Sequence, residues 1–211
     1  SLYRILQDTA NTTPDHQAVI CGDNSYSYSA LKERVDKLAT SLMSSGLKKD
    51  DRIGIIHRNC HTYLETYFAA AKIGAVLVPI NYRLNGEDFV YILNDSQAKM
   101  LVAQPNLVSC LKDTKHDLPL LKKFISTDPA AADSWPDCLL YEDLIENARP
   151  APATEPFIEI DDSDMAQIYY TSGTTGKPKG VILTHRNNAA HADGTIRELK
   201  LTQQDRWLHV S

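Results

Sequence analysis

The chain has 211 residues, of which 43% are hydrophobic and 23% are charged. This balance is ordinary for a soluble globular protein, and the chain is long enough to bury a sizeable core without disulfides or metals. Its formal net charge is −5 and it contains no block of Lys and Arg residues. The composition therefore argues against a nucleic-acid-binding surface, which normally needs clustered basic side chains.

The cysteines and the first residues favour a protein that stays in the compartment where it is made. The four cysteines are widely and irregularly spaced, with no CxxC pair, so neither a disulfide framework nor a zinc site is expected. Residues 1–8 lack the apolar segment and cleavage site of a signal peptide. No stretch approaches the roughly 18 apolar residues that span a membrane. We expect a cytoplasmic protein without a transmembrane segment.

The first 79 residues alternate segments of helical periodicity with short apolar runs that are typical of buried strands. In chain order, the expected elements are a short helix from Leu2, a hairpin of residues 18–21 and 25–28, a helix capped by Ser29 and ended near Gly46, a strand at 52–57, a helix at 62–73 ended by Gly74, and a strand at 75–79.

The same alternation continues to residue 147. Asn85 and Asp88 resemble a capping box that opens a helix. After it we expect a strand at 99–103, a helix at 106–111, a strand at 123–126, and loops at 127–138 and 148–164 that flank a short helix at 141–147. Strands that alternate with helices predict an α/β fold with a mostly parallel sheet flanked by helices.

Residues 171–180 form the segment that carries chemistry. They read Thr-Ser-Gly-Thr-Thr-Gly-Lys-Pro-Lys-Gly, between an expected strand at 165–170 and another at 181–184, and a helix is expected from Arg186 onward. Glycines let the backbone approach an anion and expose its N–H groups. Hydroxyls add donors, and lysines add charge-assisted bonds to phosphate. The composition predicts a phosphate-binding loop.

The loop differs from the Walker-type pattern G-x-x-x-x-G-K-[ST], which runs directly into a helix. Here Gly173 and Gly176 are too close together, and Lys177 is followed by Pro178 rather than by Ser or Thr. A glycine-rich hairpin that binds nothing is the plain structural alternative. The full string, with both of its lysines, favours a phosphate loop of another kind.

At residues 170–180 the sequence resembles the phosphate loop of the adenylate-forming (AMP-binding) enzymes. This superfamily includes the acyl-CoA synthetases, the nonribosomal-peptide adenylation domains and firefly luciferase. A second stretch, residues 72–84, resembles another recurrent segment, and its Asn-Tyr-Arg-Leu ending is usual in fatty and aryl acyl-CoA ligases. Leu183-Thr-His-Arg-Asn187 follows the loop where the family has it. The resemblance covers practically the whole chain.

The resemblance implies an enzyme that activates a carboxylic acid with ATP and then transfers it to a thiol, commonly that of coenzyme A. ATP, Mg²⁺ and coenzyme A are the implied cofactors and co-substrates. The motif positions assign the ATP phosphate contacts to Thr171, Ser172, Gly173, Thr174, Thr175, Gly176 and Lys179. Thr174 or Thr175 is the candidate magnesium ligand.

The resemblance also implies that residues 1–211 are an incomplete N-terminal portion of the large AMP-binding domain. The family's magnesium-binding Glu, ribose-binding Asp and C-terminal catalytic Lys match no residue here. We expect the parent to be an AMP-forming acyl-CoA synthetase for a carboxylic acid, in the fatty-acid class, and the fragment alone to be inactive. Exposed apolar surface on an incomplete domain would favour a homodimer.

Two other interpretations remain open from the sequence. An adenylation domain that loads a carrier protein would share the same loop. A non-catalytic nucleotide-binding module could retain the loop as a sensor or a relic, although the intact Ser172, Gly173, Thr174 and Lys179 argue against decay.

Overall fold

The computed structural model describes residues 1–130, 135, 137–149, 158–172 and 176–208. Its centre is a seven-stranded sheet with the strand order β7-β6-β5-β3-β4-β8-β9. Six neighbouring strands are parallel, and β9 pairs with β8 in the antiparallel direction. The predicted α/β fold with a mostly parallel sheet is confirmed.

The strands of this sheet are short, as apolar runs bounded by turns predict. They are β3 (Arg52–Ile56), β4 (Val76–Pro79), β5 (Ala98–Ala103), β6 (Lys123–Ser126), β7 (Leu139–Leu140), β8 (Met165–Thr171) and β9 (Lys179–Thr184). A separate hairpin consists of β1 (Gln17–Cys21) and β2 (Asn24–Ser27).

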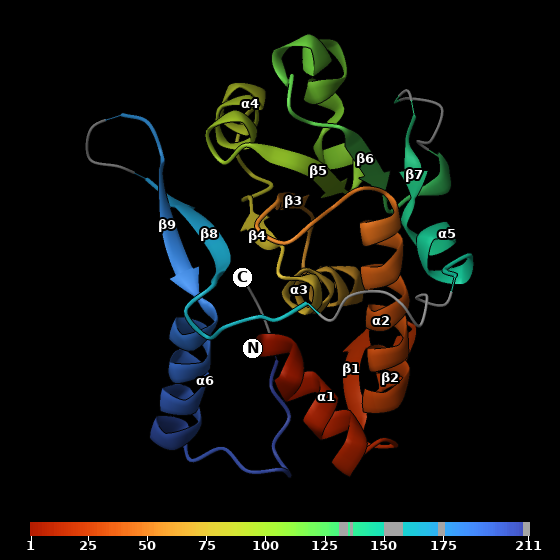
Figure 1. Ribbon diagram of the computed structural model, residues 1–211, viewed down its shortest axis with the longest axis vertical. Helices are drawn as coiled ribbons and strands as arrows, with labels where there is room; N and C mark the ends of the chain where they lie inside the picture. The colour runs from red at the N-terminus through yellow and green to blue at the C-terminus, as the bar shows by residue number, and fades with distance from the viewer. Residues whose placement is uncertain (131–134, 136, 150–157, 173–175, 209–211) are drawn as a thin grey trace.

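Helices cover both faces of the sheet (Figure 1). They are α1 (Leu2–Thr12), α2 (Tyr28–Ser44), α3 (His61–Ile73), α4 (Gly86–Asp95), α5 (Tyr141–Glu146) and α6 (His185–Leu199), with two 3-10 helices, η1 (Pro105–Leu107) and η2 (Ser109–Asp117).

Alternate residues of the strands face two separate cores. Met100 and Val102 of β5 pack in a cluster with α1, α2, α3 and α5. Leu101 and Ala103 pack in the opposite cluster with α4 and η2. Because both faces are covered, β3, β4 and β5 are almost wholly buried, which explains why they read as continuous apolar runs in the sequence.

Several local signals were predicted correctly. Gly74 ends α3 in the left-handed conformation at φ +70°, which glycine adopts without a steric penalty. The Asn85 side chain caps α4 by accepting a hydrogen bond from the Asp88 amide at 2.9 Å. None of the described helices has the length and apolar character required to cross a lipid bilayer.

Three local expectations were wrong in detail. The cap of α2 is Ser27 rather than Ser29, because the helix already begins at Tyr28 and the Ser27 hydroxyl accepts from the Ala30 amide. The expected α-helix at 106–111 is instead divided between η1 and η2, with Pro105 opening the first. The two-residue strand β7 was missed, since it is too short to show a periodicity.

Candidate phosphate-binding site

The predicted phosphate loop connects β8 and β9 at one edge of the sheet (Figure 1). Cross-strand pairing runs from Met165↔Thr184 to Thr171↔Lys179, so the pairing ends where the loop begins. Thr171 and Lys179 therefore stand opposite each other at the base of the loop. Gly176 has φ +109°, a conformation that L side chains rarely adopt, although a Cβ at this position would meet no described atom within 4 Å.

The structure places four of the seven predicted phosphate-contacting residues. Thr171, Ser172, Gly176 and Lys179 are all exposed and lie together at the open end of the hairpin. Gly173, Thr174 and Thr175 lie outside the described residues.

The two lysines of the loop keep their charge available. Among the described residues, neither Lys177 nor Lys179 forms an ion pair with a carboxylate. Exposed hydroxyls, a glycine-bearing backbone and two uncompensated ammonium groups make this end of the hairpin suited to a polyphosphate.

Helix α4 contacts the base of the loop, a contact that no sequence pattern predicted. The Tyr91 hydroxyl donates to the Pro178 carbonyl at 3.2 Å, and the Lys177 ammonium lies 5.0 Å from the centre of the Tyr91 ring. On the other arm, the Tyr170 hydroxyl donates to Asp95 Oδ2 at 2.6 Å. Burial, followed by this bond to a carboxylate, raises the pKa of Tyr170 well above its usual value.

Gly180 makes room for the Tyr170 side chain. A Cβ at Gly180 would lie 2.8 Å from Ile168 Cγ2 and 3.2 Å from Tyr170 Cζ. Tyr170 and Gly180 are cross-strand partners, so the phenol ring lies directly against a position that has no side chain. The glycine after Lys179 thus has a packing role in addition to any role in phosphate binding.

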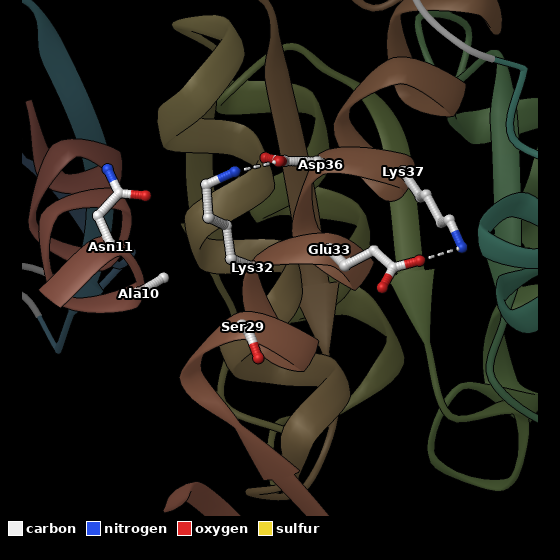
Figure 2. A pocket seen from close by; sticks show the side chains of 7 residues that line it. All are labelled: Ala10, Asn11, Ser29, Lys32, Glu33, Asp36 and Lys37. Carbon is white, nitrogen blue, oxygen red and sulfur yellow. Dashed lines mark hydrogen bonds and ion pairs between the residues drawn. The ribbon is translucent and has the colours of Figure 1, made fainter. Parts of the chain in front are cut away.

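A second concave surface, between α1 and α2, offers no comparable chemistry. This groove has a volume of about 350 Å³ and is lined by charges that already neutralise one another (Figure 2). Lys32 Nζ lies 2.7 Å from Asp36, and Lys37 Nζ lies 2.7 Å from Glu33. Burial alone would raise the pKa of Asp36, but hydrogen bonds from Lys32, Lys72 and Tyr3 hold that pKa below its usual value.

A preformed metal site is not found in the part of the chain that the structure describes. No group of three or more His, Cys, Asp or Glu side chains there is arranged to hold an ion. The predicted magnesium ligands Thr174 and Thr175 fall outside that part. The described residues therefore supply charge and hydrogen-bond donors for an anion rather than a cage for a cation.

Comparison with known sequences identifies the family to which this hairpin belongs. The profile of the AMP-binding enzyme family matches residues 6–211. The chain belongs to the AMP-binding enzyme family. The resemblance in the loop at residues 170–180 is thereby confirmed over almost the whole chain.

Curated proteins similar to this chain include CoA ligases. The chain is 34% identical over 194 residues to 4-hydroxybutyrate–CoA ligase 2 of Metallosphaera sedula, covering 87% of this chain and 34% of that protein. It is 31% identical to a crotonobetaine/carnitine–CoA ligase of Salmonella paratyphi A, covering 89% of this chain and 37% of the relative. The chain thus spans about a third of the length of these relatives.

Solved structures of the AMP-binding family share the fold. A protein of Rhodopseudomonas palustris described as a long-chain-fatty-acid CoA ligase aligns with a TM-score of 0.85 and 25% identity, over 97% of this chain and 49% of that one. The N-terminal domain of FACL13 from Mycobacterium tuberculosis aligns with a TM-score of 0.69 and 31% identity, over 87% of this chain and 44% of that one.

Proposed function

We propose that this chain is the N-terminal, phosphate-binding part of an AMP-forming acyl-CoA synthetase. The observation that carries the proposal is the β8–β9 hairpin, which presents Thr171, Ser172, Gly176 and Lys179 together and exposed. Membership of the AMP-binding family and the likeness to CoA ligases support it. Residues 1–211 would then form an incomplete portion of the large domain.

In the proposed reaction, a carboxylate oxygen of the acid attacks the α-phosphorus of ATP. The bond from that phosphorus to the oxygen shared with the β-phosphate breaks, and pyrophosphate leaves. The thiol of coenzyme A then attacks the acyl carbon, loses its proton, and displaces AMP. Both steps depend on positioning and on stabilisation of charge.

The loop holds the β- and γ-phosphates in this scheme. Thr171 and Ser172 donate hydroxyl hydrogen bonds, Gly173 and Gly176 expose backbone N–H groups, and Lys179 neutralises charge on the departing pyrophosphate. Thr174 and Thr175 complete the set of donors. Thr174 or Thr175 would supply a hydroxyl ligand to magnesium, which would neutralise phosphate charge.

The substrate that we propose is a fatty or related carboxylic acid. The Asn-Tyr-Arg-Leu sequence at residues 81–84 favours the fatty and aryl ligases by resemblance. Exchange of labelled pyrophosphate into ATP, measured on the full-length protein with a panel of acids, tests both the activity and the acid. No exchange with any acid would contradict the proposed function.

Lys179 provides a direct test of the loop in the full-length protein. Lys179→Ala should lower the rate of pyrophosphate exchange by about a hundredfold, because it removes a cation from the leaving group. The matched control is Lys200→Ala, a lysine at the C-terminal cap of α6. An equal effect of both substitutions would show that the loop lysine has no special role.

We expect the 211-residue chain by itself to be inactive in the same exchange assay, because the adenosine-binding and catalytic lysine motifs match none of its residues. Robust turnover by the chain alone would overturn this expectation.

The proposal also accounts for the apolar side chains exposed on β9, on α6 and after it. They are Val181, Ile182, Ile196, Leu199, Trp207 and Leu208. We propose that the remainder of the domain covers them in the parent enzyme and that the isolated chain forms homodimers through them. Light scattering that shows a monomer at high concentration would contradict the second part.

A further inference from the structure

Helix α4 holds both arms of the phosphate loop from a single face. Asp95 accepts a 2.6 Å hydrogen bond from Tyr170 at the end of β8, and Tyr91 donates a 3.2 Å hydrogen bond to Pro178 just before β9. Tyr91 and Asp95 are four residues apart, so their side chains lie on the same side of the helix. The two ends of the loop are therefore both hydrogen-bonded to the same helix.

The helix is a firm support because its opposite side is buried. Phe89, Ile92 and Leu93 are each 1% exposed or less and pack in the core against β5. The positions of Tyr91 and Asp95 are thus set by the packing of α4 against the sheet and not by the loop. The contacts to Tyr170 and Pro178 transmit that position to the hairpin.

Gly180 is part of the same arrangement. Because a Cβ at this position would lie 2.8 Å from Ile168 Cγ2 and 3.2 Å from Tyr170 Cζ, a side chain there would displace the phenol ring. Tyr170 would then lose its alignment with Asp95. The glycine next to Lys179 is needed for the anchor as well as for the strand.

Lys177 is held in a contact that a phosphate can replace. Its ammonium lies 5.0 Å from the centre of the Tyr91 ring and has no carboxylate partner among the described residues. An exposed cation–π contact is weak, whereas a charge-assisted bond to phosphate is among the stronger hydrogen bonds. Arrival of a polyphosphate would therefore draw Lys177 from the ring without disturbing the Tyr91 hydroxyl on Pro178.

We propose that Tyr91 and Asp95 are positioning residues of the phosphate loop. They fix the directions of its two arms, and the Tyr91 ring holds Lys177 until phosphate binds. This role rests on the proposed function, since the orientation of the loop matters for function only if the loop binds phosphate. Neither residue belongs to the set that the family motif assigns to the phosphates.

The first test measures the anchor without any ligand. Trypsin cleaves after Lys179, whereas the Lys177–Pro178 bond resists it because proline follows. In the 211-residue chain, Tyr91→Leu and Asp95→Ala should each accelerate cleavage at Lys179–Gly180 by about fivefold, because each removes a contact that restrains the arm. Tyr91→Phe, which keeps the ring but loses the hydroxyl, should have an intermediate effect.

Tyr82→Leu is the matched control. Tyr82 also carries cation–π contacts, with Arg58 and Arg83 at 5.8 and 5.2 Å from its ring centre, but no hydrogen bond or cation–π contact joins it to the described residues of the loop. Its substitution should leave the cleavage rate within twofold of the original. Equal rates for Tyr91→Leu, Asp95→Ala and Tyr82→Leu would overturn the proposal.

The second test uses the full-length protein and separates positioning from mere support. In pyrophosphate exchange, Tyr91→Leu should raise KM for ATP about fivefold and leave KM for the acid unchanged. Faster cleavage with an unaltered KM for ATP would overturn the positioning role. If the two variants were cleaved faster but the wild-type protein performed no exchange with any acid, the anchor would be established, whereas the proposed function, and with it the role in positioning phosphate, would be overturned.

Discussion

The centre of the sheet and its β9 edge differ in how much of their apolar surface the chain itself covers. In the sheet body, which we define as β3 to β6 with α2, α3 and α4, Ile55 is 0% exposed. In the edge unit, which we define as β8, β9 and α6, Ile182 is 54% exposed. Of the residues of α6, all of which the structure describes, only His185 is buried.

This difference suggests that the sheet body mainly stabilises the fold, whereas the edge unit carries the groups proposed to bind ligand. The sheet body contributes to two buried cores and pairs its buried Glu65 with Arg34. The edge unit instead presents uncompensated lysines, hydroxyls and apolar side chains to the outside. A region that offers groups for binding cannot also bury them, so the proposed phosphate loop lies in the less buried of the two regions.

The largest expected effect concerns the buried ion pair of the sheet body. Arg34 Nε donates to Glu65 Oε1 at 2.6 Å, the Glu65 side chain is fully buried, and Tyr141 donates to its other oxygen at 3.0 Å. Arg34→Met would leave that carboxylate buried without its cation. We expect a loss of about 3–5 kcal/mol in the free energy of unfolding, measured by urea denaturation.

Two controls make the loss at Arg34 specific. Arg197→Met in the edge unit removes an exposed pair with Asp193 and should change the free energy of unfolding by less than about 0.5 kcal/mol. Adding Glu65→Leu to Arg34→Met should restore most of the lost stability, because no buried charge then remains. A small effect of Arg34→Met would show that the sheet body does not depend on this pair.

A matched pair of isoleucines compares apolar burial directly. Ile55→Ala in β3 should destabilise the chain by about 2–4 kcal/mol, because it leaves a cavity in a packed core. Ile182→Ala in β9 should stay within about 0.5 kcal/mol, since its side chain is already largely in water. Urea titration of both variants gives the comparison, and similar losses would mean that the edge unit is covered in solution.

The sequence predicted the elements of the sheet body well because their signals are local. Gly74 needs its left-handed conformation whatever surrounds it, and Asn85 caps a helix through its own neighbours. Apolar runs such as residues 75–79 indicate burial directly. The strands on either side of residues 172–178 were also predicted, whereas phosphate binding by the glycines, hydroxyls and lysines between them stays a prediction.

The anchors of the loop were not predictable in the same way. Tyr91 meets Pro178 across 87 residues of sequence, and Asp95 meets Tyr170 across 75. Their spacing along α4 shows only that they share a helix face. Which partner that face meets depends on the order of strands in the sheet, which no local pattern specifies.

The border between the sheet body and the edge unit, where β4 meets β8, contains a buried side chain whose polar atoms lack hydrogen-bond partners among the described residues. Gln167 of β8 is 1% exposed and pairs with Leu77 of β4. Its carboxamide lies near the Tyr67 hydroxyl but forms no hydrogen bond of good geometry within the described residues. Gln167→Leu should raise the free energy of unfolding by about 1 kcal/mol, because it removes an unsatisfied buried group. A clear loss of stability would reveal a partner for this amide in solution.

The smallest expected effects come from two histidines, the half-buried His57 beside the sheet body and the buried His185 in the edge unit. Burial lowers the pKa of His57 and of His185 below the usual value. His57 Nδ1 donates to the Arg58 carbonyl at 2.7 Å and Nε2 lies 3.0 Å from the Thr127 hydroxyl, while His185 Nδ1 accepts from the Leu2 amide. These contacts fit neutral rings.

The sign of the pH dependence follows from these lowered pKa values. In the unfolded chain these histidines have a pKa of about 6.5. As the pH falls, the unfolded chain therefore binds protons at these residues before the folded chain does. Their stabilising contribution is therefore complete above that pH and is lost as the pH falls through the lower pKa of the folded state. His57→Gln and His185→Gln should each flatten the decline of stability between pH 7.5 and 5.5, whereas the exposed His191→Gln should not.

The two regions can be distinguished by the measurement in which each substitution flattens the pH dependence of stability. His57 lies next to β3, so its substitution should change the pH dependence of global unfolding measured in urea. His185 joins β9 to α6, so its substitution should act mainly on local opening of the edge unit, measured by hydrogen exchange of the β9 amides. If both substitutions altered only global unfolding, and to the same extent, the edge unit would be as firmly joined to the fold as the sheet body, and the contrast drawn from their burial would fail.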